Sequence, residues 1–403
     1  MRGHFAGQII PITIATAVSA VISISIEPAR AEGSAAPNTA PSTLRTAWGE
    51  PNLQGIWTDE TYTALQRPAA YADQEFFTEA QRAELDRVRG ALLGKDKRTE
   101  RGTELDVGGS YNDVFMSRKR TGARTSLIVD PPNGRIPSLT AEAQKLAAAD
   151  REFRLALLQS TETCKMNLPT CNGGKYDPTP SPRRLEPPPR YIATNAVFIN
   201  RHDGPEDGHL SQRCLNSGLP EFGTAFGGSF RRIVQTAGGI SMYYDFGQGQ
   251  GFQRNIVMDG SPHLPASIRQ WYGDSRGHWE GDTLVIDVTN FSPKTDFQGS
   301  RENLHLIERW RRTGPTTLEY EVTMEDATVW TRPWKVKQEF TKQSDTQNRI
   351  YYEPRCNEGN YALPGLLHGA RIDELAFVQG RGPDPATRDG ATALTGAEDD
   401  PLQ

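Results

Sequence analysis

Hydrophobic and polar residues alternate along many short segments in the second half of the chain. In residues 304–312, the apolar Leu304, Leu306 and Trp310 alternate with the polar His305 and Arg309. A period of two places successive side chains on opposite faces, which is typical of a β-strand with one buried face. The same pattern predicts strands at 191–199, 231–236, 240–246, 253–258, 283–288, 304–312, 317–325, 334–340 and 349–353.

The connections between these segments are short and rich in Gly, Pro, Asp and Asn, which favours an antiparallel meander. Many strands without crossover helices predict a closed or nearly closed barrel, because closure removes the exposed edges of a flat sheet. A β-sandwich is the alternative. A first strand is expected at 53–58, where Gly55-Ile56-Trp57 resembles the opening strand of lipocalin-type barrels. The expected fold class is therefore mainly β, with a lipocalin- or calycin-like barrel.

Two amphipathic helices are predicted before the sheet. Thr78 and Gln81 form a capping-box pattern ahead of a helical segment that ends at Leu93. Thr140 has the pattern of an N-cap for a second helix that reaches about Leu158. Both helices are interpreted as structural.

The chain begins with the pattern of a secretion signal. Arg2 and His4 precede an apolar run at 9–26, and Ala29-Arg30-Ala31 matches a cleavage site. No later stretch is long and apolar enough to span a bilayer, so a periplasmic or secreted protein is expected after cleavage near Ala31. The expected parts are a signal peptide at 1–31, a disordered leader at 32–50, a first strand with a helical region packed on the barrel at 51–174, a proline-rich connector at 175–190, the barrel domain at 191–380 and a disordered tail at 381–403.

Four cysteines in an exported chain favour disulfides over free thiols. The expected pairs are Cys164–Cys171 and Cys214–Cys356, although four cysteines allow other connectivities. Zinc is the alternative interpretation, and the absence of a C-x-x-C pair speaks against it.

The formal net charge of −5 is small for 403 residues, and no basic cluster follows a nucleic-acid-binding pattern. We therefore expect no nucleic-acid partner. The glycine run at 247–251 lacks the helix that a phosphate loop requires, so a hairpin turn is expected and no cofactor is predicted. The expected partner is a small-molecule or saccharide-like substrate. The sequence leaves the oligomeric state open.

The strongest concentration of polar chemistry lies in residues 271–291. There, Trp271, Asp274, Arg276 and Glu280 crowd into a segment that precedes an apolar strand. An ordinary surface turn needs only glycine and one or two polar side chains. We therefore predict a polar turn at 274–282 that contributes to a site, followed by a conventional strand at 283–288.

Three other side chains are candidates for proton transfer. Glu308 falls on the apolar face of segment 304–312, where burial raises a carboxyl pKa unless a cation compensates; a structural ion pair with an interior arginine is the alternative. His305 lies on the opposite face and Arg309 beside it. His263 lies between two prolines that stiffen its backbone. For both histidines, an ordinary structural hydrogen bond is the alternative.

Two further segments carry candidate groups. A disulfide at Cys356 would hold Glu358, Asn360 and Tyr361 in fixed positions for substrate binding. The histidines and carboxylates of segment 201–209 offer possible metal ligands, but their spacing matches no metal motif, and we interpret the segment as a solvated loop.

Taken with these motifs, the chain resembles a poorly characterised family of exported bacterial β-rich proteins. The resemblance rests on 51–58, 213–215, 262–265, 271–291, 304–309, 331–334 and 356–361. Its most specific part is the signature GDSRGxWEGDTLVxDxTNF, followed by a CxEGNY motif. Many relatives carry histidine where this chain has Asn357, so a role for an imidazole there does not transfer. The resemblance implies an exported β-rich protein and no particular reaction.

The favoured function is a cofactor-independent enzyme, a lyase or isomerase, because no activated serine, thiol nucleophile or recognisable metal motif is present. A non-catalytic lipocalin-type binding protein is the first alternative. A glycoside or ester hydrolase using paired carboxylates such as Asp274 and Glu280 is the second. The candidate roles are His305 or His263 as base, Glu308 or Asp274 as acid or orienting partner, and Arg276 or Arg309 as electrostatic stabiliser.

Overall fold

The structure is a computed structural model that describes residues 44–93, 119–168, 171–194, 199–215, 218–222, 230–245, 251–344 and 361–388. All of these residues belong to one compact unit, Thr43–Gln403.

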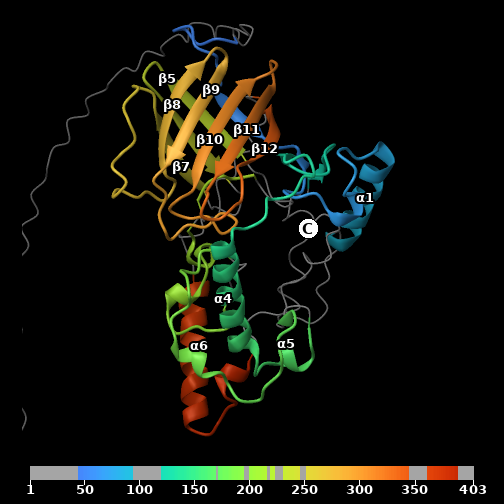
Figure 1. The fold of residues 1–403 in the computed structure, drawn as a ribbon, viewed down its shortest axis with the longest axis vertical. Helices are drawn as coiled ribbons and strands as arrows, with labels where there is room; N and C mark the ends of the chain where they lie inside the picture. Colours follow the sequence, from blue (N-terminus) through green and yellow to red (C-terminus); the bar gives the residue numbers. More distant parts are fainter. Residues whose placement is uncertain are drawn as a thin grey trace, which may run out of the picture. The chain divides into compact units, whose positions relative to one another are not determined.

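Nine strands form a closed barrel, drawn at the top of Figure 1. They follow one another in the order β1 Gly55–Thr58, β5 Phe230–Thr236, β6 Gly239–Asp245, β7 Gly251–Val257, β8 Asp274–Glu280, β9 Thr283–Thr289, β10 His305–Arg312, β11 Thr317–Glu325 and β12 Trp334–Lys342. The ring closes where β12 pairs with β1, at Trp57 opposite Lys342. The predicted mainly β barrel is confirmed.

One pairing departs from an antiparallel meander. Strands β7 and β8 are parallel and meet at a single register position, Val257 opposite Arg276. The loop between them, residues 258–273, therefore has to return along the barrel before β8 begins. An additional short strand, β4 Ile128–Asp130, pairs with β12 outside the ring.

The barrel interior is a packed core. The inward-facing side chains of β9, β10 and β11 that are 0–2% exposed are Leu284, Ile286, Val288, Leu306, Glu308, Trp310, Leu318, Tyr320, Val322 and Met324. A side chain beside a water-sized void would keep accessible surface, so no such void adjoins these residues. Burying each large apolar side chain contributes about 1.5–3 kcal/mol to stability. This part of the interior holds the barrel together and offers no ligand cavity.

The helices and a small second sheet lie outside the barrel strands. Helix α1, Glu79–Leu93, begins with the predicted capping box, in which Gln81 N donates to Thr78 Oγ1 at 3.2 Å and Thr78 N donates to Gln81 Oε1 at 2.8 Å. Thr140 likewise caps α4. The remaining elements are β2 Thr61–Tyr62, β3 Arg120–Thr121, α4 Ala141–Leu158, α5 Glu162–Lys165, α6 Ala362–Val378 and the 3-10 turns η1 Ala69–Tyr71, η3 Pro182–Leu185, η5 Pro205–Asp207, η6 Leu210–Arg213 and η7 Pro385–Thr387.

Several local predictions differ from the structure. The predicted polar turn at 274–282 is mostly strand: β8 spans Asp274–Glu280, and only Gly281 and Asp282 form the turn to β9. Gly281 has a φ of 60°, which a glycine adopts without strain, so two residues suffice to reverse the chain. The described residues of segment 191–199 contain no strand. Residues 362–378, within the predicted barrel domain, form α6. The predicted strand at 349–353 lies outside the described residues.

The predicted disulfide between Cys164 and Cys171 is confirmed, with a Cα–Cα distance of 5.1 Å. Both thiols are consumed in this bond, which excludes them as zinc ligands. Cys214 is also disulfide-bonded, and Cys356 lies outside the described residues. Among the helices that the structure describes, none is long and apolar enough to cross a membrane.

Candidate functional site

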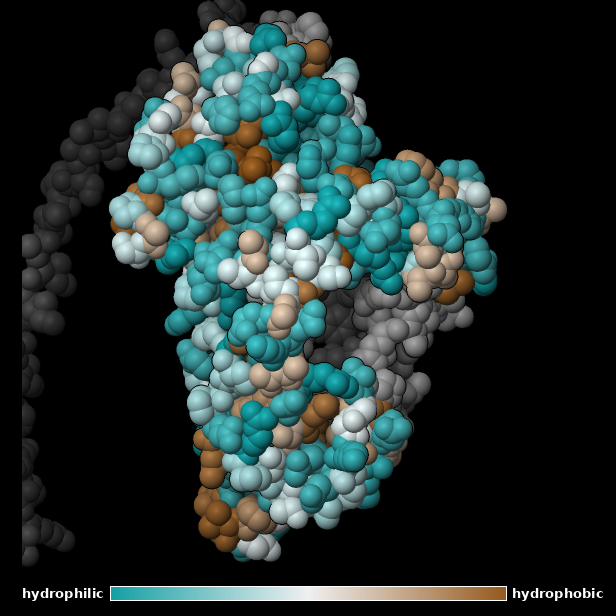
Figure 2. Space-filling model, in the orientation of Figure 1, coloured by the Kyte–Doolittle hydropathy of each residue, from teal (hydrophilic) through white to brown (hydrophobic). Residues whose placement is uncertain are grey.

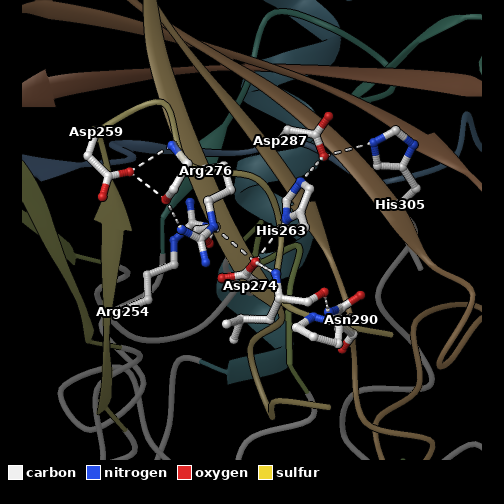
Figure 3. Close-up of polar contacts among 12 residues, drawn as sticks. Arg254, Asp259, His263, Asp274, Arg276, Asp287, Asn290 and His305 are labelled. Atoms are coloured by element: carbon white, nitrogen blue, oxygen red, sulfur yellow. Dashed lines mark hydrogen bonds and ion pairs between the residues drawn. The ribbon is translucent and has the colours of Figure 1, made fainter. Parts of the chain in front are cut away.

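Two histidines and three carboxylates form a continuous series of hydrogen bonds on the outer face of the barrel. Figure 3 shows the part of this series from Asp274 through His263 and Asp287 to His305. We call this series, Asp274–His263–Asp287–His305–Glu325, the histidine–carboxylate chain. His263 Nδ1 lies 2.9 Å from Asp274 Oδ2, and His263 Nε2 lies 3.0 Å from Asp287 Oδ1. His305 Nε2 lies 3.1 Å from the same Asp287 oxygen, and His305 Nδ1 lies 3.2 Å from Glu325 Oε2. One carboxylate thus joins the two imidazoles.

The strand register explains why three members of the histidine–carboxylate chain lie next to one another. His305 on β10 is directly opposite Glu325 on β11. Asp287 on β9 is opposite Ile307, two residues along β10 from His305. Because alternate residues share a face, Asp287 and His305 are diagonal neighbours, within reach of long side chains. All three point away from the buried core.

His263 reaches the sheet from the loop between β7 and β8. The carboxylate of Asp274 accepts from the backbone N–H of Leu264 at 2.9 Å as well as from His263. Asn290 Nδ2 donates to the carbonyl of Leu264 at 2.8 Å. These bonds fasten the loop on both sides of the imidazole, and the flanking prolines restrict its backbone further.

The series continues beyond Asp274. Arg276 Nε donates to Asp274 Oδ2 at 3.0 Å, and Arg276 Nη1 donates to Ser261 Oγ at 2.6 Å. Ser261 in turn donates to Asp259 Oδ1 at 2.5 Å. Arg276 is therefore held by two partners, and its main contact is to the carboxylate that orients His263.

The geometry has a direct consequence for protonation. A neutral imidazole has one N–H, whereas both nitrogens of His263 and of His305 face carboxylate oxygens. All four contacts are hydrogen bonds only when both rings carry two protons. The hydrogen bond to Asp287 raises the pKa of His305, in keeping with this arrangement. With both rings protonated, three carboxylates face two imidazoliums and Arg276, so the charges balance.

The carboxylates respond in the opposite direction. The hydrogen bond from His305 lowers the pKa of Asp287 despite its partial burial. Burial raises the pKa of Asp274, but hydrogen bonds from Arg276, Leu264 N and His263 together outweigh it and lower the pKa. Both carboxylates are thus held ionised and accept hydrogen bonds from the ring N–H groups.

The two imidazoles are reachable from solvent. The side chain of His263 is 28% exposed and that of His305 is 31% exposed. Asp287 and Glu325 are more open, at 42% and 38%, while Asp274 is buried at 5%. The histidine–carboxylate chain therefore runs from a buried end at Asp274 to a solvent-exposed end at Glu325.

Glu308 does not belong to this group. It faces the barrel interior, where it forms an ion pair with Arg254 of β7 and is fully buried. Tyr320 and Trp310 donate to its two oxygens at 3.1 and 3.3 Å. The sheet itself separates Glu308 from His305, because adjacent residues of a strand point to opposite faces. The structure therefore corresponds to the alternative of a structural ion pair with an interior arginine.

The remaining candidates are scattered. Glu280 lies at the opposite end of β8 from Asp274, about 20 Å away at a strand rise of 3.3 Å per residue. This is too far for the paired carboxylates of a glycosidase. Arg309 Nη2 donates to Glu280 at 2.7 Å, in an exposed pair. Trp271 precedes β8 and is partly buried, and Tyr361 is 83% exposed.

Glu358, Asn360 and Asn357 lie outside the described residues. Within the part of the chain that the structure describes, no group of three or more His, Cys, Asp or Glu could hold a metal ion. In segment 201–209, Asp207 is buried and accepts from Arg201 at 2.8 Å and from the backbone of Asp203 at 2.8 Å. That carboxylate has a structural role.

Two members of the histidine–carboxylate chain, Asp287 and Glu325, were not among the candidates from sequence. Each lies at an outward position of a correctly predicted strand, at 283–288 and 317–325. An acidic residue on the wet face of a strand is ordinary, so the pattern carries no signal by itself. Only pairing β9 and β11 with β10 places both next to His305.

Comparisons with known proteins add little to this picture. No family model matches the chain, and no curated protein matches it either. Among solved structures, a secretory abundant heat soluble (SAHS) protein from Ramazzottius varieornatus matches with a TM-score of 0.21 and 12% sequence identity, over 29% of this chain and 72% of that protein. A likeness at this level carries no argument about function.

Proposed function

We propose that this protein is an enzyme that moves protons on a small organic or sugar-like molecule, as a lyase or isomerase, at the outer face of the barrel. One observation carries the proposal: Asp287 lies between the imidazoles of His263 and His305, at 3.0 and 3.1 Å. A carboxylate that His263 holds in place orients the ring of His305 and stabilises its protonated form.

Only His305 offers a nitrogen to a substrate, because both nitrogens of His263 face Asp274 and Asp287, whereas His305 Nδ1 is released when Glu325 moves away. His305 is the acid in the resting protein, because its hydrogen bond to Asp287 raises its pKa. Its Nδ1 proton passes to one substrate atom, and the neutral ring then takes a proton from a substrate carbon, so that no proton is gained or lost overall. Asp287 remains a carboxylate throughout and stabilises whichever ring is charged.

Glu325 is the group that a substrate displaces. Glu325 is the exposed end of the histidine–carboxylate chain, and its hydrogen bond to His305 Nδ1 is the longest of the four at 3.2 Å. When Glu325 swings outward, Nδ1 faces solvent while Nε2 stays fixed on Asp287. Arg276 has a positioning role, because Asp274 and Ser261 already hold its guanidinium.

Hydrogen exchange tests the proposal without a known substrate. The full chain is incubated in D₂O with small hydroxy acids, ketones and sugars, and replacement of C–H by C–D is followed by proton NMR. At least one compound should exchange in the presence of the protein. His305→Asn should lower the rate about 10²–10⁴-fold, the usual contribution of a general acid or base, and His263→Asn should lower it less, because His263 positions Asp287.

His278→Asn is the matched control. His278 also lies on the outer face, on β8, but its side chain is 58% exposed and contacts only Glu280 among the residues that the structure describes. This variant should retain the full rate. Exchange that is equal in His305→Asn and in the original chain would contradict the proposal.

The family resemblance and export are part of the same proposal. Three of the segments that carry the resemblance, 262–265, 271–291 and 304–309, supply His263, Asp274, Asp287 and His305. A signature whose separate segments meet in one group of side chains supports membership in that family. The Cys164–Cys171 disulfide supports export, since such bonds persist in oxidising compartments.

Ligand binding without catalysis is the second candidate. It is favoured by the completeness of the histidine–carboxylate chain, in which each ring nitrogen already has a carboxylate partner. On this alternative, a ligand would change the NMR signals of His305 without any C–H exchange. The same samples distinguish the two functions.

A further inference from the structure

A cavity lies between the segment that contains η5 and η6 and the N-terminal half of α6. Its walls include His202, Gly204 and Gln212 on one side and Leu363, Leu366 and Leu367 on the other. Its volume is about 110 Å³, smaller than the roughly 300–1,000 Å³ of pockets that enclose drug-sized ligands, so it holds only a small molecule or part of one. None of these residues belongs to the histidine–carboxylate chain.

Helix α6 supplies the apolar wall. Leu363, Leu366 and Leu367 are spaced three and four residues apart, so they lie on one face of the helix. No residue of α6 is classed as buried among the described residues. Hydrophobic side chains gather over the surface of this helix in Figure 2. The leucines are therefore available to an apolar ligand.

The opposite wall supplies a polar group. The imidazole of His202 is partly buried and makes no hydrogen bond to any residue that the structure describes. Burial lowers its pKa, although Asp207 opposes the shift, so the ring is neutral near pH 7. A neutral imidazole offers one donor and one acceptor. A ligand hydroxyl matches both.

The two walls are tied together. Arg371 of α6 donates to the carbonyl of Asp203 at 2.9 Å and to the carbonyl of His202 at 3.1 Å. On the other side, Arg201 and Asp207 fix the segment through a buried ion pair at 2.8 Å. The cavity is thus formed before a ligand enters, which lowers the entropic cost of binding.

We infer that this cavity binds a small uncharged amphipathic molecule of the phenol or naphthol class. Its aromatic body packs against the three leucines, and its hydroxyl hydrogen-bonds to His202. The volume of about 110 Å³ admits one aromatic ring, and the second ring of a naphthol lies at the open side. This binding is independent of the proton-transfer function proposed above.

The experiment uses 2-naphthol as probe, followed by its fluorescence on titration with the full chain. Saturable binding to one site is expected. Gly204→Val should weaken the binding of 2-naphthol at least tenfold, because the larger side chain fills the cavity. The variant should fold without strain, because Gly204 has an extended backbone with φ −151° and an added Cβ meets nothing within 4 Å. Leu366→Gln should also weaken binding at least tenfold.

Leu375→Gln is the matched control, because Leu375 is an exposed leucine of the same helix, at 55%, and does not line the cavity. It should leave the affinity unchanged. His202→Phe should reduce the preference for 2-naphthol over naphthalene. The inference is overturned if no saturable binding occurs, if Leu375→Gln weakens binding as much as Leu366→Gln, or if the helix is covered by self-association in solution. Urea unfolding compares the stability of each variant with that of the original protein. Substrate C–H exchange at the histidine–carboxylate chain should be the same in each of these variants as in the original protein.

Discussion

Glu308 and Arg254 form an ion pair inside the barrel, on the opposite face of the sheet from His305. Both side chains are buried, at 0% and 4% exposed, and aromatic donors surround the carboxylate. Charge in such a place is tolerated only when it is paired and hydrogen-bonded. The pair therefore has a structural role in the barrel, and substituting either residue should lower the stability of the protein rather than act directly on proton transfer.

Glu308→Gln should lower the free energy of unfolding by about 3–5 kcal/mol, because it leaves the Arg254 guanidinium buried without its counter-charge. Urea denaturation measures the loss. Replacing both members, Glu308→Gln with Arg254→Met, should recover part of it. Glu280→Gln, in an exposed pair with Arg309, should lower the free energy of unfolding much less. If Glu308→Gln and Glu280→Gln cost the same, the interior pair does not stabilise the barrel as described.

The stability of the protein should fall as the pH rises above neutrality, in part because of His305. Its folded-state pKa is raised by the hydrogen bond to Asp287. Its stabilising contribution is therefore fully present below the unfolded value of about 6.5 and is lost as the pH rises through the folded value. Because the pair is partly exposed, the contribution is about 1 kcal/mol or less. Urea unfolding between pH 5.5 and 9 should show a smaller decline for His305→Asn, and an equal decline would contradict the arrangement.

Asp287→Asn should lower the pKa of His305 towards its ordinary value, because it removes the largest cause of the upward shift. The titration of the His305 ring protons in NMR measures this directly. The same change replaces the carboxylate that His263 Nε2 faces by a neutral amide, whose oxygen is a weaker acceptor, so the loop that carries His263 should become more mobile. Amide exchange at Leu264 reports on that loop. Asp282→Asn, at the exposed turn after β8, should change neither reading.

Asn290 anchors the same loop through its side chain and also has a backbone φ of 58°. Asn290→Ala should lose the hydrogen bond to the Leu264 carbonyl, worth about 0.5–1.5 kcal/mol, and should add about 1–2 kcal/mol for placing alanine in a left-handed conformation. Asn290→Gly loses only the hydrogen bond, since glycine tolerates the backbone. Thermal or urea unfolding of both variants separates the two effects. Equal destabilisation would show that backbone strain plays no part.

The individual strands and helices were largely predictable from the sequence. Segment 317–325 alternates so regularly that its predicted bounds coincide with β11. Segment 274–280 was not predicted as a strand for a physical reason. Asp274, Arg276, His278 and Glu280 share the outer face, and of the inner residues Ser275, Gly277 and Trp279 only the last is apolar and large, so no apolar alternation is visible in the sequence. A glycine there is required by packing, since an added Cβ would lie 2.5 Å from Met258 Sδ.

The site was only partly predictable. His263, Asp274, Arg276 and His305 were candidates from sequence and lie together, whereas Glu308 was a candidate and lies on the other face. Alternation along β10 already placed Glu308 and His305 on opposite faces, but it did not say which face carries the site. That depends on where His263 reaches the sheet, and the parallel pairing of β7 with β8 sends its loop over the outer face.

The sequence by itself determined the period of each strand, the caps of two helices and the side chains that share a face. These features depend on neighbours a few residues apart, and local geometry encodes them. Tertiary structure alone decided the closure of β1 on β12, the pairing of Glu308 with Arg254, and the joining of His263 and His305 through Asp287. Those contacts link residues that are distant in the sequence, so they form only when all the strands of the barrel are paired in the correct register.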